Sequence, residues 1–411
     1  MTRFLLVLCV AGLCSAEENR VAELARQARG NPAEFRQAVL DALGAEGTGN
    51  GTAVLTHGED FLWAVESASA PMLFVNEQRG PALRRGAGNL WYAFGRLPTG
   101  TIHSFHYLRG GERFGGRTDV PAYPPEAYEQ PGVPKGKLTE KRVHTSRLYP
   151  GMKSDYWVWA PAQYDPATPA ALMVWQDGEQ LADRFRWRSQ IVFENLTHQK
   201  KIPIIVHVFI SPGFIGEERV RSQQYDVVND TFARFLRDEI LPEVYKDYSI
   251  RRDGYSRAIA GDSSGGICAF NAAWHQPDQF SRVLSRIGSF TSIRWLPGVI
   301  EGGNVYPFKI RKEPKRNIRV WLQAAAGDLE NSHGSWPLQN IQMANSLKMM
   351  DYDFRLSWGQ GTHNRAHGAA EVHEEMVWLW RGYDPAKTAA VYEQDPAERG
   401  KPMFRVSIAN R

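Results

Sequence analysis

The sequence predicts an α/β fold with a mostly parallel, doubly covered sheet, preceded by a small all-β sandwich. Between residues 140 and 382, apolar runs of strand length alternate with segments of helical spacing, which is typical of a parallel sheet. The run IPIIVHVFI (202–210) is almost continuously apolar, as expected for a strand buried on both faces. Between residues 52 and 114, short aromatic and β-branched runs are separated by Gly, Pro and Asn, which indicates antiparallel strands.

The first sixteen residues, MTRFLLVLCVAGLCSA, have the pattern of a secretory signal peptide. Arg3 precedes an apolar run that ends at Leu13, and we expect cleavage after Ala16. The alternatives are a buried N-terminal helix and a lipoprotein signal at Cys14, which the bulky preceding leucine disfavours. No later run reaches the roughly 18 apolar residues of a membrane span. We therefore expect a secreted or periplasmic protein without a membrane span.

The remaining segments follow in order. Residues 17–43 have helical spacing interrupted by Gly-Asn-Pro, and predict two short helices as a lead-in. The sandwich is expected over 44–118. Residues 119–139 contain five prolines and predict an extended linker. The α/β domain is expected over 140–382, with helices at 226–248, 264–274, 338–350 and 370–380, and a C-terminal tail over 383–411.

Composition and charge narrow the classes of function. The net charge is +4, and the basic residues are dispersed, which disfavours nucleic-acid binding. Of three cysteines, only Cys268 would remain after cleavage, so no internal disulfide is expected. Its apolar surroundings indicate a small buried side chain rather than a nucleophile. No motif implies a metal or cofactor, and the oligomeric state is left open.

The stretch AIAGDSSGGICAF joins an apolar strand to a helical segment through Gly-Asp-Ser-Ser-Gly. A nucleophile on such a tight turn needs small residues two positions before and after it, which assigns the role to Ser263. The N–H of Ser264, at the helix start, is then a candidate donor to an oxyanion. The alternative is a glycine-rich turn with a serine N-cap.

A serine nucleophile needs a base and an orienting carboxylate, which this class of fold supplies after later strands. The strand IRVWLQAAAG is followed by Asp328, which we prefer over Glu330 because it lies nearer the strand end. The strand DFRLSWG is followed by His363, which we prefer over His367. A loop carboxylate and structural histidines are the alternatives.

A second oxyanion donor is expected after an early strand. The strand ALMVWQDG ends in Gln-Asp-Gly, so we expect the N–H of Glu179 to fill this role, with a plain turn as the alternative.

With these residues, the C-terminal two-thirds resembles the esterase-D-like α/β-hydrolases, which include enterochelin esterases, feruloyl and acetyl-xylan esterases, and mycolyltransferases. The matching motifs are QDG, GDSSGG, GDLEN and GTHN, together with RSQQYD at 221–226, where Gln224 stands in place of the family's Glu. The sandwich resembles the N-terminal immunoglobulin-like domain of enterochelin esterases and the glycogen-binding-type modules of some feruloyl esterases. Asp177, Arg221, Trp295, Trp336 and His367 are expected as possible substrate-binding residues, with Trp187 as a further aromatic candidate.

The resemblance implies a secreted serine carboxylic-ester hydrolase acting through an acyl-enzyme, on a small-molecule or polysaccharide-linked ester. Two alternatives use the same scaffold. One is acyl transfer to a sugar acceptor, and the other is a non-catalytic glycan-binding envelope protein.

Overall fold

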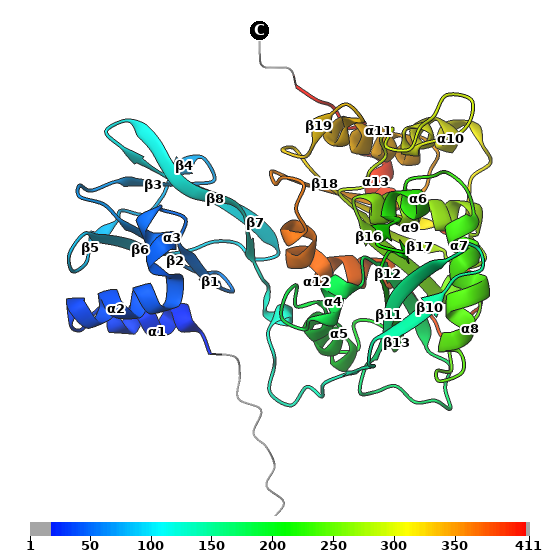
Figure 1. The fold of residues 1–411 in the computed structure, drawn as a ribbon, viewed down its shortest axis with the longest axis horizontal. Helices are drawn as coiled ribbons and strands as arrows, with labels where there is room; N and C mark the ends of the chain where they lie inside the picture. The colour runs from blue at the N-terminus through cyan, green and yellow to red at the C-terminus, as the bar shows by residue number, and fades with distance from the viewer. Residues whose placement is uncertain (1–17, 408–411) are drawn as a thin grey trace, which may run out of the picture.

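The structure is a computed structural model that describes residues 18–407. The predicted signal peptide therefore lies outside the described residues. Figure 1 shows two parts, a β-rich N-terminal domain (blue to cyan) and a larger α/β domain (green to red). Within residues 18–407, no helix is both long and apolar enough to cross a membrane.

Three helices lead into the N-terminal domain, namely α1 (Arg20–Gln27), α2 (Pro32–Leu43) and α3 (Ala45–Gly49). The side chain of Asn19 caps α1, and that of Asn31 caps α2, which has proline at its first position. The two predicted helices are confirmed as α1 and α2, and their apolar faces pack on the outer face of the first sheet.

The N-terminal domain is a sandwich of two four-stranded antiparallel sheets, ordered β1-β2-β6-β5 and β4-β3-β7-β8. The facing sides of the two sheets share one apolar core that includes Trp63 and Tyr107. The last strand continues to Ala122, past the boundary expected at 118. The strands are β1 (Val54–His57), β2 (Asp60–Glu66), β3 (Met72–Val75), β4 (Gln78–Arg79), β5 (Arg84–Arg85), β6 (Leu90–Arg96), β7 (Thr101–Arg109) and β8 (Glu112–Ala122).

The proline-rich segment contributes to the core of the α/β domain. Tyr123 and Ala127 are buried there, in and beside the short 3₁₀ helix η1 (Pro125–Ala127). Further along, β9 (Lys137–Leu138) pairs with the end of β11. The segment is thus a packed connection rather than only a surface linker.

The α/β domain contains an eleven-stranded sheet with the main order β15-β14-β11-β13-β12-β16-β17-β18-β21. From β13 to β21 all neighbours are parallel, and β11 is antiparallel to β13. Every residue of β12, β13, β16 and β17 is buried. The strands are β10 (Arg142–Thr145), β11 (Met152–Ala160), β12 (Ala171–Gln176), β13 (Ile205–Ile210), β14 (Phe214–Ile215), β15 (Glu218–Arg219), β16 (Arg257–Asp262), β17 (Arg282–Arg286), β18 (Arg319–Ala325) and β21 (Asp353–Gly359).

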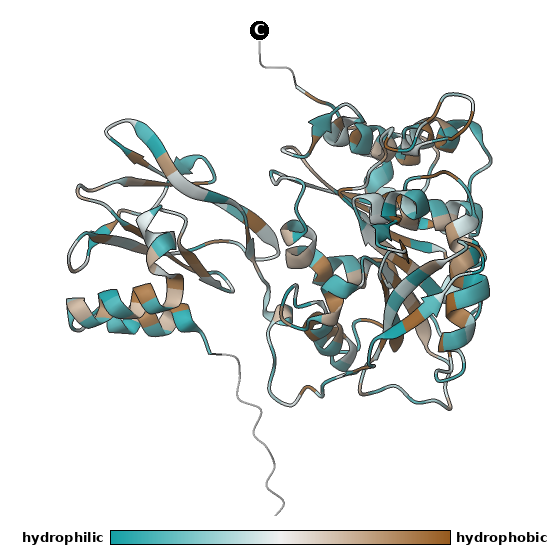
Figure 2. Ribbon diagram, viewed as in Figure 1, coloured by the Kyte–Doolittle hydropathy of each residue, from teal (hydrophilic) through white to brown (hydrophobic). Residues whose placement is uncertain are grey.

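Helices cover both faces of this sheet, as the sequence predicts. Alternate residues of β12 belong to two separate apolar clusters: Leu172 and Val174 face α7–α11, whereas Met173 and Trp175 face α5 and α12. Figure 2 shows brown strands in the middle of the domain with mixed helices around them. The helices are α4 (Glu179–Ala182), α5 (Ser189–His198), α6 (Arg221–Tyr225), α7 (Thr231–Phe235), α8 (Leu241–Val244), α9 (Ser264–His275), α10 (Tyr306–Lys312), α11 (Trp336–Met349), α12 (Ala366–Trp380) and α13 (Pro396–Arg399).

The single helix expected over 226–248 is wrong in its start and its regularity. A turn follows α6, and α7 begins only at Thr231. A π-helical turn, Leu236–Ile240, then joins α7 to α8. Pro242 lies at the start of α8, where it has no N–H to donate to the preceding turn, which accounts for the widened turn.

Candidate active site

Ser263 occupies a sharp turn between β16 and α9. Its backbone has φ 60° and ψ −121°, a conformation that side chains with a Cβ rarely adopt. A Cβ on Gly261 would lie 2.4 Å from the carbonyl of Gly265, so position 261 requires glycine. The Ser263 N–H donates to Arg286 O at 2.9 Å, and Ser263 O accepts from Ser289 N–H at 3.0 Å. The turn is therefore held by the neighbouring strand and its loop.

The structure brings Ser263, His363 and Asp328 together. The Nε2 atom of His363 lies 2.8 Å from Ser263 Oγ, and its Nδ1 atom lies 2.5 Å from Asp328 Oδ1. With the Nδ1–H donating to the carboxylate, Nε2 is free to accept the hydroxyl proton. The Asp328 side chain is 1% exposed and that of His363 is 21% exposed. This series of hydrogen bonds can turn the serine hydroxyl into a nucleophile.

The parallel pairing of β18 and β21 explains why the acid and the base meet. The loops after these two strands are joined by hydrogen bonds from Ala326 N–H to Gly359 O (2.9 Å) and from Gly327 N–H to Gly361 O (3.0 Å). Asp328 and His363 follow directly on these two loops. The N–H of Leu329 also donates to Asp328 Oδ1 at 2.7 Å, which fixes the carboxylate further.

A second hydroxyl, which sequence reasoning missed, lies beside the nucleophile. Ser289 Oγ is 3.2 Å from Ser263 Oγ and accepts a hydrogen bond from Trp336 Nε1 at 3.1 Å. The indole of Trp336 also meets the ring of His363 edge-on, with centroids 5.7 Å apart. Ser289 follows β17, the strand next to β16, so its place at the carboxyl edge of the sheet was the available signal.

The loop after β12 lies against the start of α9. A Cβ on Gly265 would be 3.1 Å from Gln176 Cβ and 3.3 Å from Asp177 Oδ2. A Cβ on Gly178 would be 2.3 Å from the backbone of β13, so a glycine is required there too. Glu179 and Ser264 each begin a helix, where their N–H groups have no acceptor within the helix. The two predicted oxyanion donors thus stand at the first residues of α4 and α9, and α9 directly follows the nucleophile turn.

Asp177 is buried and bound to Arg221, which corrects the expected role of Asp177 in substrate binding, whereas the side chain of Arg221 stays 22% exposed. Arg221 donates to both carboxylate oxygens of Asp177 at 2.7 Å, and also to Asp262 O at 3.1 Å. Arg365, two residues after His363, donates to the same carboxylate at 3.1 Å. The Asp177 side chain is 2% exposed. This pair therefore holds three loops of the site together.

Gln224 takes part in the same region as an acceptor. Its side-chain oxygen accepts from Gly213 N–H at 2.7 Å, and it is buried. A Glu side chain at position 224 could accept the same hydrogen bond. The replacement of the family's Glu by Gln224 therefore leaves this contact intact.

His367 is buried, which also corrects its expected role in substrate binding. Its Nδ1 atom lies 3.1 Å from Gln323 Nε2, and burial together with Arg286 lowers its pKa to about 4. The ring is therefore a neutral acceptor inside the domain. A Cβ on Gly359 would be 2.4 Å from this ring, so the histidine packs directly under β21.

The predicted tryptophans differ in exposure. Trp336 is 2% exposed and forms part of the wall behind His363, whereas Trp295 is 50% exposed. Trp187 is partly buried against the core. Cys268 is fully buried in α9, as predicted, and burial raises the pKa of its thiol. Across the part of the chain that the structure describes, no three His, Cys, Asp or Glu side chains are grouped to hold a metal.

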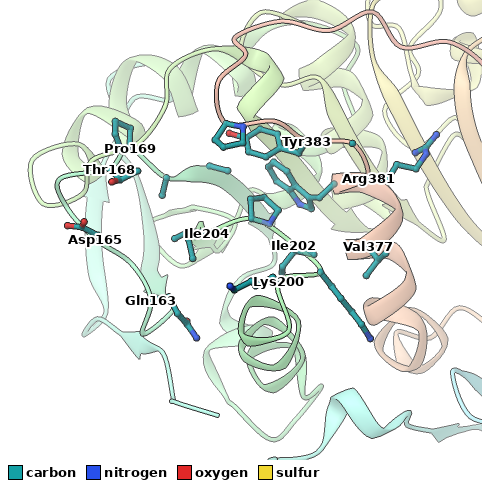
Figure 3. A pocket seen from close by; sticks show the side chains of 17 residues that line it. Gln163, Asp165, Thr168, Pro169, Lys200, Ile202, Ile204, Val377, Arg381 and Tyr383 are labelled. Carbon is teal, nitrogen blue, oxygen red and sulfur yellow. The ribbon is translucent and has the colours of Figure 1, made fainter. Parts of the chain in front are cut away.

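A cavity of about 630 Å³ lies at the opposite end of the sheet, by the start of β12. Figure 3 shows side chains of its wall, which include Ile202, Ile204 and Tyr383. Ser263 does not line it, so this cavity is separate from the candidate active site.

Comparisons with known proteins agree with this geometry. Residues 150–365, just over half of the chain, match the sequence profile of the Esterase family. The iron(III) enterobactin esterase of Dickeya dadantii is 28% identical over 229 residues, which are 54% of this chain and 48% of that protein. The ferri-bacillibactin esterase of Bacillus subtilis is 32% identical over 104 residues, 25% of this chain and 34% of that protein. The chain thus spans about half or less of the length of these curated relatives.

Solved structures are similar over a larger share of the chain. The enterobactin esterase of Shigella flexneri has a TM-score of 0.53 at 16% identity, covering 81% of this chain and 97% of that one. The ferric enterobactin esterase of Salmonella typhimurium gives 0.53 at 17% identity, with the same shares covered. At these identities the likeness concerns the fold, with the N-terminal β-sheet domain followed by the α/β domain.

Proposed function

Because this chain belongs to the Esterase family of α/β-hydrolases, we propose that it is a serine carboxylic-ester hydrolase acting through an acyl-enzyme. The observation that carries the proposal is the series of contacts from Ser263 Oγ to His363 Nε2 (2.8 Å) and from His363 Nδ1 to Asp328 (2.5 Å). These contacts supply a nucleophile, a base and an orienting carboxylate in one place.

In the first half of the reaction, Ser263 Oγ attacks the ester carbonyl carbon while His363 Nε2 takes the hydroxyl proton. Asp328 stabilises the imidazolium that forms and remains ionised. The tetrahedral intermediate collapses, the C–O bond to the alcohol breaks, and the imidazolium returns its proton to the leaving alkoxide. Water then attacks the acyl-enzyme by the same route, and the acid leaves.

The N–H groups of Ser264 and Glu179 serve in this proposal as donors to the intermediate's oxyanion. Ser264 stands at the start of α9, where the positive end of the helix dipole favours negative charge, and Glu179 is the first residue of the short helix α4 after β12. One such donor is typically worth about 3 kcal/mol in the transition state.

For the substrate, we favour an ester that carries an aromatic group near the scissile bond, with a catecholate siderophore ester as the first candidate. The support is the names of the curated relatives, which are iron(III) enterobactin and ferri-bacillibactin esterases. The half-exposed indole of Trp295 offers a face on which an aromatic ring can stack. The pattern of residues 1–16 supports export of the mature chain.

The test compares the mature wild type with Ser263→Ala on p-nitrophenyl acetate, methyl ferulate and enterobactin. Loss of the nucleophile is expected to lower kcat by about 10⁴-fold or more. Ser292→Ala is a matched control, because this serine follows the loop after β17 and its hydroxyl donates to His333 O at 2.8 Å, away from the Ser263 hydroxyl. Equal turnover by wild type and Ser263→Ala would end the proposal.

The same samples separate the two alternatives. A fluorophosphonate adduct on Ser263 is expected, and its absence would favour a non-catalytic glycan-binding protein. Transfer of the acyl group to an added oligosaccharide, in place of release as the free acid, would indicate an acyltransferase.

A further inference from the structure

The N-terminal sandwich touches the loop that carries His363. Strands β7 and β8 pack against α12, the helix that follows this loop (Figure 1). Asp119, on β8, accepts hydrogen bonds from both the N–H of Thr362, at 2.9 Å, and the Thr362 hydroxyl. Thr362 directly precedes His363. A carboxylate of the N-terminal domain thus binds the residue that directly precedes the candidate base of the α/β domain.

The backbone of the loop is pressed between the two domains. A Cβ on Gly361 would lie 2.4 Å from Ile102 Cδ1 and 2.7 Å from Asp119 Oδ1, so the loop lies directly on β7 and β8. On its other side, Gly361 O accepts from the N–H of Gly327, next to Asp328. The loop is therefore held by the sandwich on one side and by the acid's loop on the other.

A β-bulge turns Asp119 toward this loop. In the pairing of β7 with β8, His103 faces Val120 but Phe105 faces Arg117, which leaves one extra residue on β8. Asp119 lies within this bulge and has φ 55°, a left-handed conformation that Asp and Asn tolerate better than most residues. Bulges of this kind redirect a side chain away from the regular ladder.

We propose that Asp119 is a positioning residue, by which the N-terminal domain fixes the His363 ring against Ser263. This inference rests on the proposed function. The residues from Gln360 to Arg365 form no regular helix or strand, so individual hydrogen bonds set the position of the imidazole. A shift of roughly 1 Å in a reacting group can cost about a hundredfold in rate.

The test compares Asp119→Ala with Asp119→Asn in the full mature chain. Asparagine keeps an oxygen for the Thr362 N–H, can donate to the Thr362 hydroxyl, and tolerates a positive φ. Alanine loses both bonds. We expect Asp119→Ala to lower kcat on p-nitrophenyl acetate by about ten- to a hundredfold. We expect KM to stay within about twofold of wild type, because the contact does not touch substrate. Asp119→Asn should restore most of the activity.

Asp41→Ala is the matched control, because it removes an exposed carboxylate from α2 in the same domain. It should leave kcat unchanged. Thr362→Val provides a second route should Asp119→Ala fail to fold, because it removes the hydroxyl bond alone and should give a smaller loss of kcat. An interface that only joins the domains would lower Tm in Asp119→Ala and leave kcat as in wild type, which would overturn the proposal.

Amide hydrogen exchange in a peptide covering residues 359–365 gives a readout that needs no substrate. We expect faster exchange in Asp119→Ala than in wild type, with no change in Asp41→Ala. Unchanged exchange in Asp119→Ala would also overturn the proposal. Should wild type hydrolyse no ester, the proposed function fails, and the exchange still decides whether Asp119 holds the loop.

Discussion

The positive φ of Ser263 yields a prediction that separates the effect of backbone strain on stability from the effect of losing the hydroxyl. Ser263→Gly and Ser263→Ala both remove the hydroxyl and its contacts with His363 and Ser289. The difference between the two variants therefore reports on the backbone. At φ 60° and ψ −121°, a residue with a Cβ is strained by about 1–3 kcal/mol, whereas glycine is not.

We expect Ser263→Gly to be the more stable variant. The greater freedom of glycine in the unfolded chain offsets the relief of strain by about 0.4–1 kcal/mol. The net difference should be about 1 kcal/mol in the free energy of unfolding. For a domain of about 250 residues this corresponds to roughly 2–4 °C in Tm. Urea unfolding and thermal melts of both variants measure it, and both should lack esterase activity.

The matched control is the same pair of substitutions at Gln342, an exposed residue within α11. There the order should reverse, with Gln342→Ala more stable than Gln342→Gly by about 1 kcal/mol. Should Ser263→Ala prove as stable as Ser263→Gly or more so, the turn is not strained and the reasoning is wrong.

Other substitutions test single contacts in the site. Asp328→Asn should lower kcat by about 10⁴-fold, because an amide no longer holds the reactive tautomer of His363; a loss below about tenfold would contradict this. Gly178→Ala should lower the free energy of unfolding by about 1–3 kcal/mol, because the added Cβ meets the backbone of β13 at 2.3 Å; an unchanged urea midpoint would argue against the packing. The lowered pKa of His367, about 4, means that the unfolded chain binds more protons between about pH 6.5 and pH 4. The contribution of neutral His367 to the free energy of unfolding is therefore complete above pH 6.5. It is lost as the pH falls toward 4, and the loss amounts to about 2 kcal/mol at pH 5. His367→Gln, which keeps an acceptor for Gln323, should reduce the loss of unfolding free energy between pH 7.5 and pH 5, and equal losses in both proteins would refute the assignment.

The nucleophile turn could be predicted because its constraints are local. Gly261 must be glycine because a Cβ there would meet the backbone of Gly265, and a Cβ on Gly265 would be tight against Gln176 and Asp177. These requirements appear in the sequence as a fixed spacing around Ser263. The acid and the base could be predicted for a related reason. The carboxyl ends of neighbouring parallel strands share one edge of the sheet, so residues that follow β18 and β21 must lie close together.

Some expectations failed where a side chain's surroundings decide its role. His367 is four residues from His363, yet it is buried because α12 begins between them and turns it into the domain. Asp177 follows a strand at the carboxyl edge of the sheet, but arginines from two distant segments neutralise it. No local pattern distinguishes these side chains from ones that face substrate.

By itself, the sequence of this protein determined the alternation of strands and helices in the α/β domain, the double cover of its central sheet, and the turn that carries Ser263. These follow from the periodicity of apolar residues and from steric limits on the backbone, which act over a few positions. Only the tertiary structure decided the contacts of Ser289 with the nucleophile and of Asp119 with Thr362. The last two residues are 243 positions apart, and their hydrogen bonds depend on how the N-terminal sandwich packs against the α/β domain. Such a contact follows from the packing of two surfaces, and this packing produces no periodic pattern in the amino-acid sequence.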